Sequence, residues 1–320
     1  MTTTDKFLQM GIAVVLFFGV MALILLLTQS LRSRRGERVQ AAAFLAPSLV
    51  LIGIGLLYPA IKTVYLSFRN SAGTEWVGFE NYQKIFTDSQ ELEILRNTAL
   101  WVVLVPLVST GVGLVYAVLV DRSRFERFAK TLVFLPMAIS LVGASIIWKF
   151  VYAYRDGTRP QIGILNGAFK AVGIDPYNFV FEQPWNTLFL IVILIWVQAG
   201  FAMTILSASI KAIPEDIIEA ARLDGVSGLQ LFRHITVPSI RPSLIVVLTT
   251  ISISTLKVFD IVRSTTGGNF GTKVLAFEFY VQSYRSLNTG LGAAIATLIF
   301  VLVSPIVIYN IRQMRRLEAR

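Results

Sequence analysis

The sequence predicts an all-α fold, a bundle of membrane-spanning helices, and three observations support that prediction. Hydrophobic residues make up 55% of the 320 residues, and the mean hydropathy is +0.67. Charged residues make up only 15%, against roughly 25% in an ordinary soluble domain. Apolar stretches of about 20 residues, the length that crosses a bilayer as a helix, recur along nearly the whole chain. They leave no room for a folded aqueous domain, so we expect one membrane domain.

Seven stretches qualify as spans, because a helix pairs every backbone polar group within the hydrocarbon. We expect the first to be an accessory to a six-helix core, since the remaining pattern is complete without it. The predicted spans are 7–28, 41–61, 98–120, 131–152, 185–207, 243–262 and 289–311.

The basic residues predict the orientation, because those in short loops tend to stay on the cytoplasmic side. Four segments dense in Lys and Arg alternate with longer segments that mix basic residues with acids. This alternation places the N-terminus outside and the C-terminus in the cytoplasm. The four clusters are Arg32, Arg34, Arg35, Arg38; Arg122, Arg124, Arg127, Lys130; Lys211, Arg222, Arg233, Arg241; and Arg312, Arg315, Arg316, Arg320.

A cleaved signal peptide is the alternative for the first apolar stretch. Its apolar run is longer than the core of a typical signal peptide, its basic cluster follows it, and no small-x-small cleavage site is evident. We therefore expect a retained helix. The predicted organisation is an N-terminal helix with a basic cytoplasmic linker over 1–40, and a transmembrane domain over 41–320.

Glycine and proline interrupt several predicted spans, among them Gly113 and Pro136. Close helix packing and helix ends explain most of these positions. Broken helices at a substrate site are the alternative.

Several functional classes are disfavoured by composition. The net charge of +10 comes from basic clusters between apolar blocks, which orient membrane helices instead of binding nucleic acid. The chain has no cysteine, and His234 has no histidine or cysteine partner, so we expect no metal site and no catalytic set. The phosphate-binding pattern G-x-x-x-x-G-K-[ST] is absent, so any ATP must bind elsewhere.

The longest cytoplasmic connection, 211–242, is too polar to span and carries helix signals. Pro214 followed by two acids predicts a helix start, and Gly225 predicts its end. A second short helix is expected over 227–234, with Pro238 and Pro242 closing the loop. The apolar residues of this segment exceed what a solvated linker needs, so it is expected to dock on a partner or on the underside of the bundle.

The spacing within this segment resembles the EAA loop of ABC importer permeases. In that family EAA is followed by three residues, Gly, nine residues and Ile-x-Leu-Pro, and Val237 replaces the Leu here. The resemblance implies that the first helix inserts into a cleft of a separate ATPase subunit, where Glu219 reaches a basic residue and Gly225 permits the turn. The residues it assigns to coupling are Glu219, Ala220, Ala221, Asp224, Gly225, Ile235 and Pro238.

The resemblance covers 41–320 and is closest to the maltose-type permeases of carbohydrate importers. Supporting segments are FLAPSLVLIGIGLLYPAIKTVYLSF, GFENY and TTGGN, the last resembling TxGGP with Asn269 in place of Pro. The stretch LKVFDIVRSTTGG, with GTKVLAFEFY after it, most resembles the alpha-glucoside branch.

A sugar site needs hydroxyl-pairing groups and an apolar face, so polar residues within spans are the candidates. In the resembling family the fifth and sixth spans line the central cavity. Lys257 and Asp260, three apart, can instead pair with each other on a helix. The candidates are Trp196, Gln198, Phe201, Ser252, Ser254, Thr255, Lys257 and Asp260.

The sequence is therefore identified as a non-enzymatic permease subunit of an ATP-driven, binding-protein-dependent importer of a carbohydrate. The resemblance implies a second homologous permease subunit, two ATPase subunits that bind ATP and Mg, and an extracytoplasmic binding protein. The alternative is an ion-coupled secondary transporter, which would carry ion-coupling residues at membrane depth, and Lys257 with Asp260 comes nearest to that description.

Overall fold

The computed structural model describes residues 3–28, 34–121, 124–156 and 159–318, which form helices joined by turns. Arg32, Arg122 and Arg320 of the predicted basic clusters lie outside the described residues. Contacts between residues divide the chain into two compact units, Met1–Tyr65 and Leu66–Arg320. The functional division predicted at residue 40 stays a prediction.

The first unit consists of apolar helices with little burial. Helix α1 (Thr3–Thr28) contacts α2 (Arg34–Ile52), and α2 continues through a π-helical turn (Gly53–Leu57) into α3 (Tyr58–Leu66). The most apolar window of Ala41–Leu66 has no buried residue. A helix with that many exposed apolar side chains fits hydrocarbon better than water.

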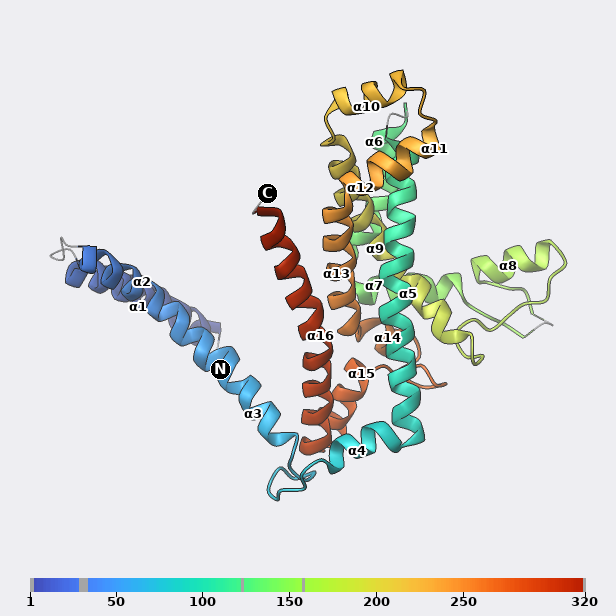
Figure 1. The fold of residues 1–320 in the computed structure, drawn as a ribbon. Helices are drawn as coiled ribbons and strands as arrows, with labels where there is room; N and C mark the ends of the chain where they lie inside the picture. The colour runs from blue at the N-terminus through green and yellow to red at the C-terminus, as the bar shows by residue number, and fades with distance from the viewer. Residues whose placement is uncertain (1–2, 29–33, 122–123, 157–158, 319–320) are drawn as a thin grey trace. The chain divides into compact units, whose positions relative to one another are not determined.

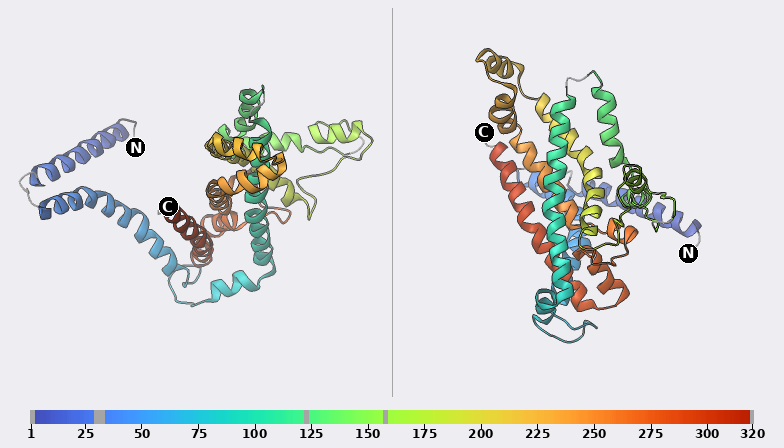
Figure 2. Two further views of the ribbon diagram at one scale, coloured as in Figure 1. Left: turned by 45° about the horizontal axis from the view of Figure 1, so that its top comes forward. Right: turned by 90° about the vertical axis from the view of Figure 1, so that its right-hand side faces the viewer.

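The second unit contains the long helices of the bundle, which run lengthwise through it (Figures 1 and 2). The short helices α10 and α11 lie at one end of this unit, and α4 with the start of α5 lies at the other (Figure 1). Its helices are α4 (Glu80–Thr87), α5 (Ser89–Val120), α6 (Glu126–Phe134), α7 (Leu141–Val151), α8 (Ile164–Ala171), α9 (Asn186–Lys211), α10 (Glu215–Leu223), α11 (Gly228–Leu231), α12 (Val237–Ser239), α13 (Arg241–Leu256), α14 (Asp260–Thr265), α15 (Leu275–Tyr280) and α16 (Thr289–Glu318).

The core of the second unit forms where α5 packs along α9 and α13. Trp101, Leu190 and Met203 are almost fully buried there. A β-carbon on Gly113 would lie 2.5 Å from the β-carbon of Ala202, so the two helices approach more closely than any larger residue allows. At this glycine the packing explanation is confirmed, and it is the one that applies in membranes, where small residues let helices associate.

Six of the predicted spans have counterparts among the described helices. Four helices are long and apolar enough to cross a membrane, and there are six spans if each of two bent helix pairs counts as one. The predicted all-α membrane bundle is therefore confirmed. Within α1, Leu8–Ala22 is a shorter apolar helix, and retention of this segment stays a prediction. The six spans are Ala41–Leu66, Ser89–Val120, Glu126–Ala138 with Leu141–Val151, Asn186–Lys211, Gly228–Ser239 with Arg241–Leu256, and Thr289–Gln313.

The predicted span 131–152 is wrong as a single helix, because it bends by 107° between Ala138 and Leu141. The buried Pro136 lies in the 3₁₀ turn before the bend, where its missing N–H weakens the helix. Ser140 then starts α7 by accepting a hydrogen bond from the Gly143 N–H at 3.1 Å. Apolar composition continues across the bend, so hydropathy alone does not reveal it.

The predicted span 243–262 ends too late, because α13 stops at Leu256. The N–H groups of Lys257 and Val258 close its last turn by donating to carbonyls three residues earlier. Asp260 begins the separate helix α14. Lys257 and Asp260 therefore do not share a helix, and no ion pair joins them within the part of the chain that the structure describes.

Candidate functional site

Residues 211–242, which join α9 to α13, are the segment to which the family resemblance assigns coupling, and we call them the coupling element. Its first helix, α10, starts as expected: Pro214 has the extended backbone of an N-cap, and Glu215 and Asp216 occupy the first turn. Acidic side chains in that position interact favourably with the positive end of the helix dipole. The local sequence therefore fixes where α10 begins.

Gly225 ends α10 in a two-bond turn known as the Schellman motif. The Val226 N–H donates to the Ala221 carbonyl at 3.1 Å, and the Gly225 N–H donates to the Arg222 carbonyl at 3.1 Å. Gly225 has a φ of +77°, which a residue with a β-carbon adopts only under strain. The predicted helix end at this glycine is confirmed, and the sharp turn aims α10 independently of the segment that follows.

The side chains of α10 divide between the bundle and the outside. Ala221 is buried, whereas Glu219 and Ala220 are exposed. Ile217 and Leu223 are also exposed, at 47% and 89%. Ile217 lies four residues before the buried Ala221 and shares its side of the helix, whereas Leu223 lies on the side of Glu219. An apolar and acidic surface therefore faces away from the bundle, as a docking surface requires.

The second part of the coupling element is longer than predicted. Ser227 caps α11 and forms a capping box with Gln230. The helix then continues through a π-helical turn (Phe232–Thr236) to Ser239 and bends by 68° into α13. Pro238 does not end it, because the π-helical turn shifts the hydrogen bonds: the Val237 N–H donates to Phe232, five residues earlier. Among the residues assigned to coupling here, Ile235 is half-buried and Pro238 is exposed.

A cluster of charged side chains, the basal ion cluster, lies beside the coupling element, where α5 and α9 end and α6 begins. Lys130 pairs with Asp121 and, at 2.9 Å, with Glu126. Lys211 pairs with Glu126 and lies 3.9 Å from Asp121. The Ser207 hydroxyl donates to Asp121 at 2.8 Å. Two acids and two bases thus join three helices at the point where the chain enters α10.

The basal ion cluster was only partly visible in the sequence. Lys130 and Lys211 were counted as orienting charges, whereas Asp121, Glu126 and Ser207 were missed. The Asp121 side chain is 7% exposed, and a carboxylate is rarely that buried without partners. The one local signal was Glu126 four residues before Lys130, a spacing that pairs charges on a helix.

The candidate solute residues of α9 lie on different sides of that helix. At 100° per residue, Gln198 and Phe201 point in similar directions, whereas Trp196 points away from both. Trp196 lines a pocket of about 390 Å³ and packs edge-on against Trp148 at 5.8 Å between ring centroids. Gln198 and Phe201 are half-buried. Gln198 therefore shares a side of α9 with Phe201 and not with Trp196.

The candidate hydroxyl groups of α13 differ in their access to solute. Thr255 is fully buried and donates to the Ile251 carbonyl at 2.7 Å, within its own helix. Ser252 likewise donates to the Leu248 carbonyl. Ser254 is exposed. Ser254 is thus the most exposed of these three hydroxyl-bearing residues.

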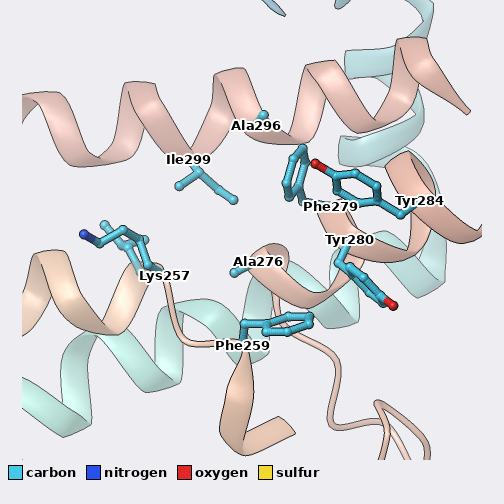
Figure 3. Close-up of a pocket in the computed structure, with 9 residues that line it drawn as sticks. Lys257, Phe259, Ala276, Phe279, Tyr280, Tyr284, Ala296 and Ile299 are labelled. Atoms are coloured by element: carbon cyan, nitrogen blue, oxygen red, sulfur yellow. The ribbon is translucent and has the colours of Figure 1, made fainter. Parts of the chain in front are cut away.

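Lys257 lines an aromatic pocket of about 410 Å³ between α13, α15 and α16 (Figure 3). Phe259, Phe279, Tyr280 and Tyr284 line it as well. In Figure 3 the Lys257 ammonium and the Tyr280 hydroxyl point away from each other, at opposite sides of the apolar space. Apolar walls with a few polar groups are the usual composition of a small-molecule site.

Two arginines flank the aromatic pocket at Tyr280. The guanidinium carbon of Arg263 lies 4.7 Å from the centre of the Tyr280 ring, and that of Arg285 lies 5.6 Å from it. Hydrogen bonds from Arg263 and Arg285 lower the pKa of the Tyr280 hydroxyl, because both stabilise the phenolate. These residues are not among those predicted from the sequence, although Tyr280 and Tyr284 have the four-residue spacing of one helix face.

Comparisons with known proteins agree with this arrangement. The family model for the binding-protein-dependent transport system inner membrane component matches residues 109–316. The osmoprotective compounds uptake permease protein GgtC of Synechocystis is 47% identical over 275 residues, 86% of this chain and 99% of that protein. The alpha-glucoside transport system permease protein AglF of Rhizobium meliloti is 46% identical over 284 residues, 88% of this chain and 84% of that protein.

The fold also matches a solved structure, that of a bacterial ABC transporter involved in the import of the acidic polysaccharide alginate. The TM-score is 0.75 at 22% sequence identity, over 89% of this chain and 99% of the matched chain. At that identity the match establishes the fold alone.

Proposed function

Because this chain belongs to the family of binding-protein-dependent transport system inner membrane components, we propose that it forms half of the membrane pathway of an ATP-driven carbohydrate importer. Membership makes it an inner-membrane permease subunit. The proposal adds the solute class, a second homologous permease subunit, a pair of ATPase subunits that bind ATP and Mg, and a topology with the N-terminus outside and the C-terminus in the cytoplasm.

The observation that carries the ATP-driven mechanism is the exposed surface of α10. Glu219 and Leu223, four residues apart, share an exposed side of a helix that starts at Pro214 and ends in the hydrogen-bonded turn at Gly225. Such a surface suits the cleft of a partner, with apolar contact for affinity and one acid for a basic residue. Glu219, Ala220, Ala221, Asp224, Gly225, Ile235 and Pro238 form this proposed coupling set.

The basal ion cluster supplies the second step of the mechanism. Lys211 is the last residue of α9, and its pairing with Glu126 ties the entry of α10 to α6. Lys130 and Asp121 extend that tie to α5. When the ATPase subunits close on ATP and move α10, the ends of the three helices move with it. Reorientation of the pathway between the two sides of the membrane follows from this shared motion.

The carbohydrate assignment rests on the relatives and on the composition of the pathway. A protein 46% identical to this chain is named for alpha-glucosides. We place the solute beside Gln198, Phe201 and Ser254, with the aromatic pocket at Lys257 next along the path. Neutral amide and hydroxyl groups pair with sugar hydroxyls, while aromatic rings cover the apolar faces of the sugar.

The test is uptake by the assembled complex in liposomes, with ATP enclosed and loaded binding protein outside. Sucrose, trehalose and maltose are compared as labelled α-glucosides. We expect uptake of at least one, dependent on both ATP and binding protein. Uptake driven by an ion gradient without ATP would contradict the proposal and support secondary transport. Failure of a broader sugar panel, with ATP-dependent uptake of another solute, would overturn the carbohydrate assignment alone.

A further inference from the structure

Residues from the first turns of α5 and from the loop before α15 line a small polar pocket. Figure 1 shows that α5 begins at the end of the second unit opposite the coupling element. The volume of the pocket is about 260 Å³, and Gln90, Glu93, Asn97 and Lys273 line it together with two glycines. Sites that enclose a whole small molecule are usually larger, roughly 300–1,000 Å³. The size suits one end of a longer solute.

The loop on one side of this pocket, Thr265–Lys273, is held rigidly. Asn97 on α5 donates to the Gly271 carbonyl at 2.6 Å and to the Lys273 carbonyl at 3.1 Å. Asn186 on α9 donates to the Phe270 carbonyl at 2.7 Å. Both asparagines are buried. The pocket wall is therefore formed before any solute arrives, which lowers the entropic cost of binding.

Polar side chains converge on this wall without using their hydrogen-bonding capacity on protein. A β-carbon on Gly271 would lie 2.4 Å from the Glu93 carboxylate and 2.8 Å from the Gln183 amide nitrogen, so both groups reach this glycine. Among the described residues, the side chains of Gln90, Glu93 and Gln183 have no hydrogen-bond partner on another protein group. Donors and acceptors are therefore available side by side.

An exposed aromatic pair includes Phe270, the residue before Gly271 in the pocket wall. The rings of Phe181 and Phe270 lie 4.7 Å apart between centroids, and each residue is 46% exposed. Phe270 directly precedes Gly271, and Phe181 lies two residues before Gln183. Large apolar side chains at an open polar pocket indicate a contact surface for a partly apolar ligand.

The charges around the pocket favour a neutral ligand. Lys273 is paired with Glu278 at 2.8 Å, between its Nζ and a carboxylate oxygen. Of the charged residues that line the pocket, Glu93 is left unpaired, and its carboxylate disfavours an anion. A saccharide hydroxyl both donates and accepts hydrogen bonds, which matches the mixture of amides and carboxylate.

We propose that this pocket is an entry subsite that binds the terminal ring of a neutral saccharide, with the ring face on the Phe181–Phe270 pair. The inference rests on the proposed carbohydrate function and adds a second contact point to the pathway, separate from the residues on α9 and α13. A solute released by the binding protein meets this pocket before it enters the membrane.

The test uses the assembled complex in nanodiscs without binding protein. An environment-sensitive fluorophore is attached to Ser89→Cys, next to Gln90, with the partner subunits made cysteine-free. The sugar that the wild-type complex imports is titrated, with mannitol as the non-glycoside control. Glu93→Ala and Gln90→Ala are compared with Glu80→Ala, an exposed acid on α4 outside the pocket.

We expect a saturable fluorescence change with the imported sugar and none with mannitol. Glu93→Ala and Gln90→Ala should each raise the half-saturating sugar concentration about fivefold, which is the effect of losing one hydrogen bond of roughly 1 kcal/mol. Glu80→Ala should match the wild type. Equal affinities in all variants, or no saturable change at Ser89→Cys, would overturn the entry subsite while uptake in liposomes still supports the importer. If no sugar is taken up, the proposed carbohydrate function is contradicted, independently of the entry subsite.

Discussion

The two ends of the second unit differ in the side-chain interactions that join segments far apart in the sequence. At the coupling end, charged side chains such as Asp121, Lys130 and Lys211 join three helices. At the opposite end, Asn97 and Asn186 bind backbone carbonyls of one loop. Ion pairs tolerate some change in geometry and respond to salt, whereas amide-to-carbonyl bonds need fixed positions. The coupling end therefore suits transmitted motion, and the opposite end suits a fixed surface.

Substitutions at two glycines with the same φ should show the largest difference between the two ends. Gly225 and Gly268 both have a φ of +77°. A β-carbon on Gly225 would meet nothing within 4 Å, whereas one on Gly268 would lie 2.2 Å from the buried ring of Phe277. We expect Gly225→Ala to cost about 1–2 kcal/mol for the strained backbone. Gly268→Ala should cost roughly 2–5 kcal/mol, because overpacking adds to the strain.

Thermal unfolding of the assembled complex in detergent checks this pair. The second substitution should lower the unfolding temperature by clearly more than the first. Equal shifts would mean that the loop at Gly268 accommodates a β-carbon as easily as the open turn at Gly225. That result would contradict a fixed surface at the end opposite the coupling end.

The next largest loss of stability is expected from Asn97, one of the two asparagines that bind the Thr265–Lys273 loop. Asn97→Ala removes the amide that donates to the Gly271 and Lys273 carbonyls, so we expect a loss of about 1–3 kcal/mol in stability. Asn178→Ala is the matched control, since that half-buried side chain has no hydrogen bond within the described part of the chain. Amide hydrogen exchange of the loop should increase in the first variant and not in the second. Unchanged exchange would show that other contacts hold the loop.

A smaller effect is expected at the basal ion cluster. Asp121→Asn removes the negative charge that faces Lys130 and Lys211. It keeps an oxygen that can accept the hydrogen bond from the Ser207 hydroxyl. We expect a stability loss of about 1 kcal/mol, because the cluster is partly exposed. The wild type should lose this advantage as salt rises, since ions screen the pairs. Unfolding temperatures at low and high salt measure both. A difference that persists unchanged at high salt would contradict the electrostatic explanation.

The coupling element shows how much local sequence determines. Pro214 with two acids marked the start of α10, and Gly225 marked its end, because caps and turns depend on neighbouring residues. The family resemblance rested on the same spacing, and the comparisons confirm it. The predicted roles of Glu219 and the solute residues stay predictions.

Features that depend on tertiary packing could not be predicted from the sequence. The bend after Pro136 and the end of α13 at Leu256 lie within continuous apolar runs, where hydropathy carries no information about direction. Asp121, Lys130 and Ser207 are brought together across as many as 86 residues, and no periodicity reports such pairing. The aromatic pocket was missed for the same reason, because its walls come from three helices.

The measurement that tests the central claim most directly is ATPase activity of the complex in lipid, with and without loaded binding protein. Glu219→Ala and Leu223→Asp alter the exposed surface of α10, and Glu215→Ala is the control on the same helix. We predict that binding protein stimulates the wild type and Glu215→Ala several-fold. Glu219→Ala and Leu223→Asp should lose that stimulation at an unchanged unfolding temperature. Full stimulation in both would contradict coupling through α10.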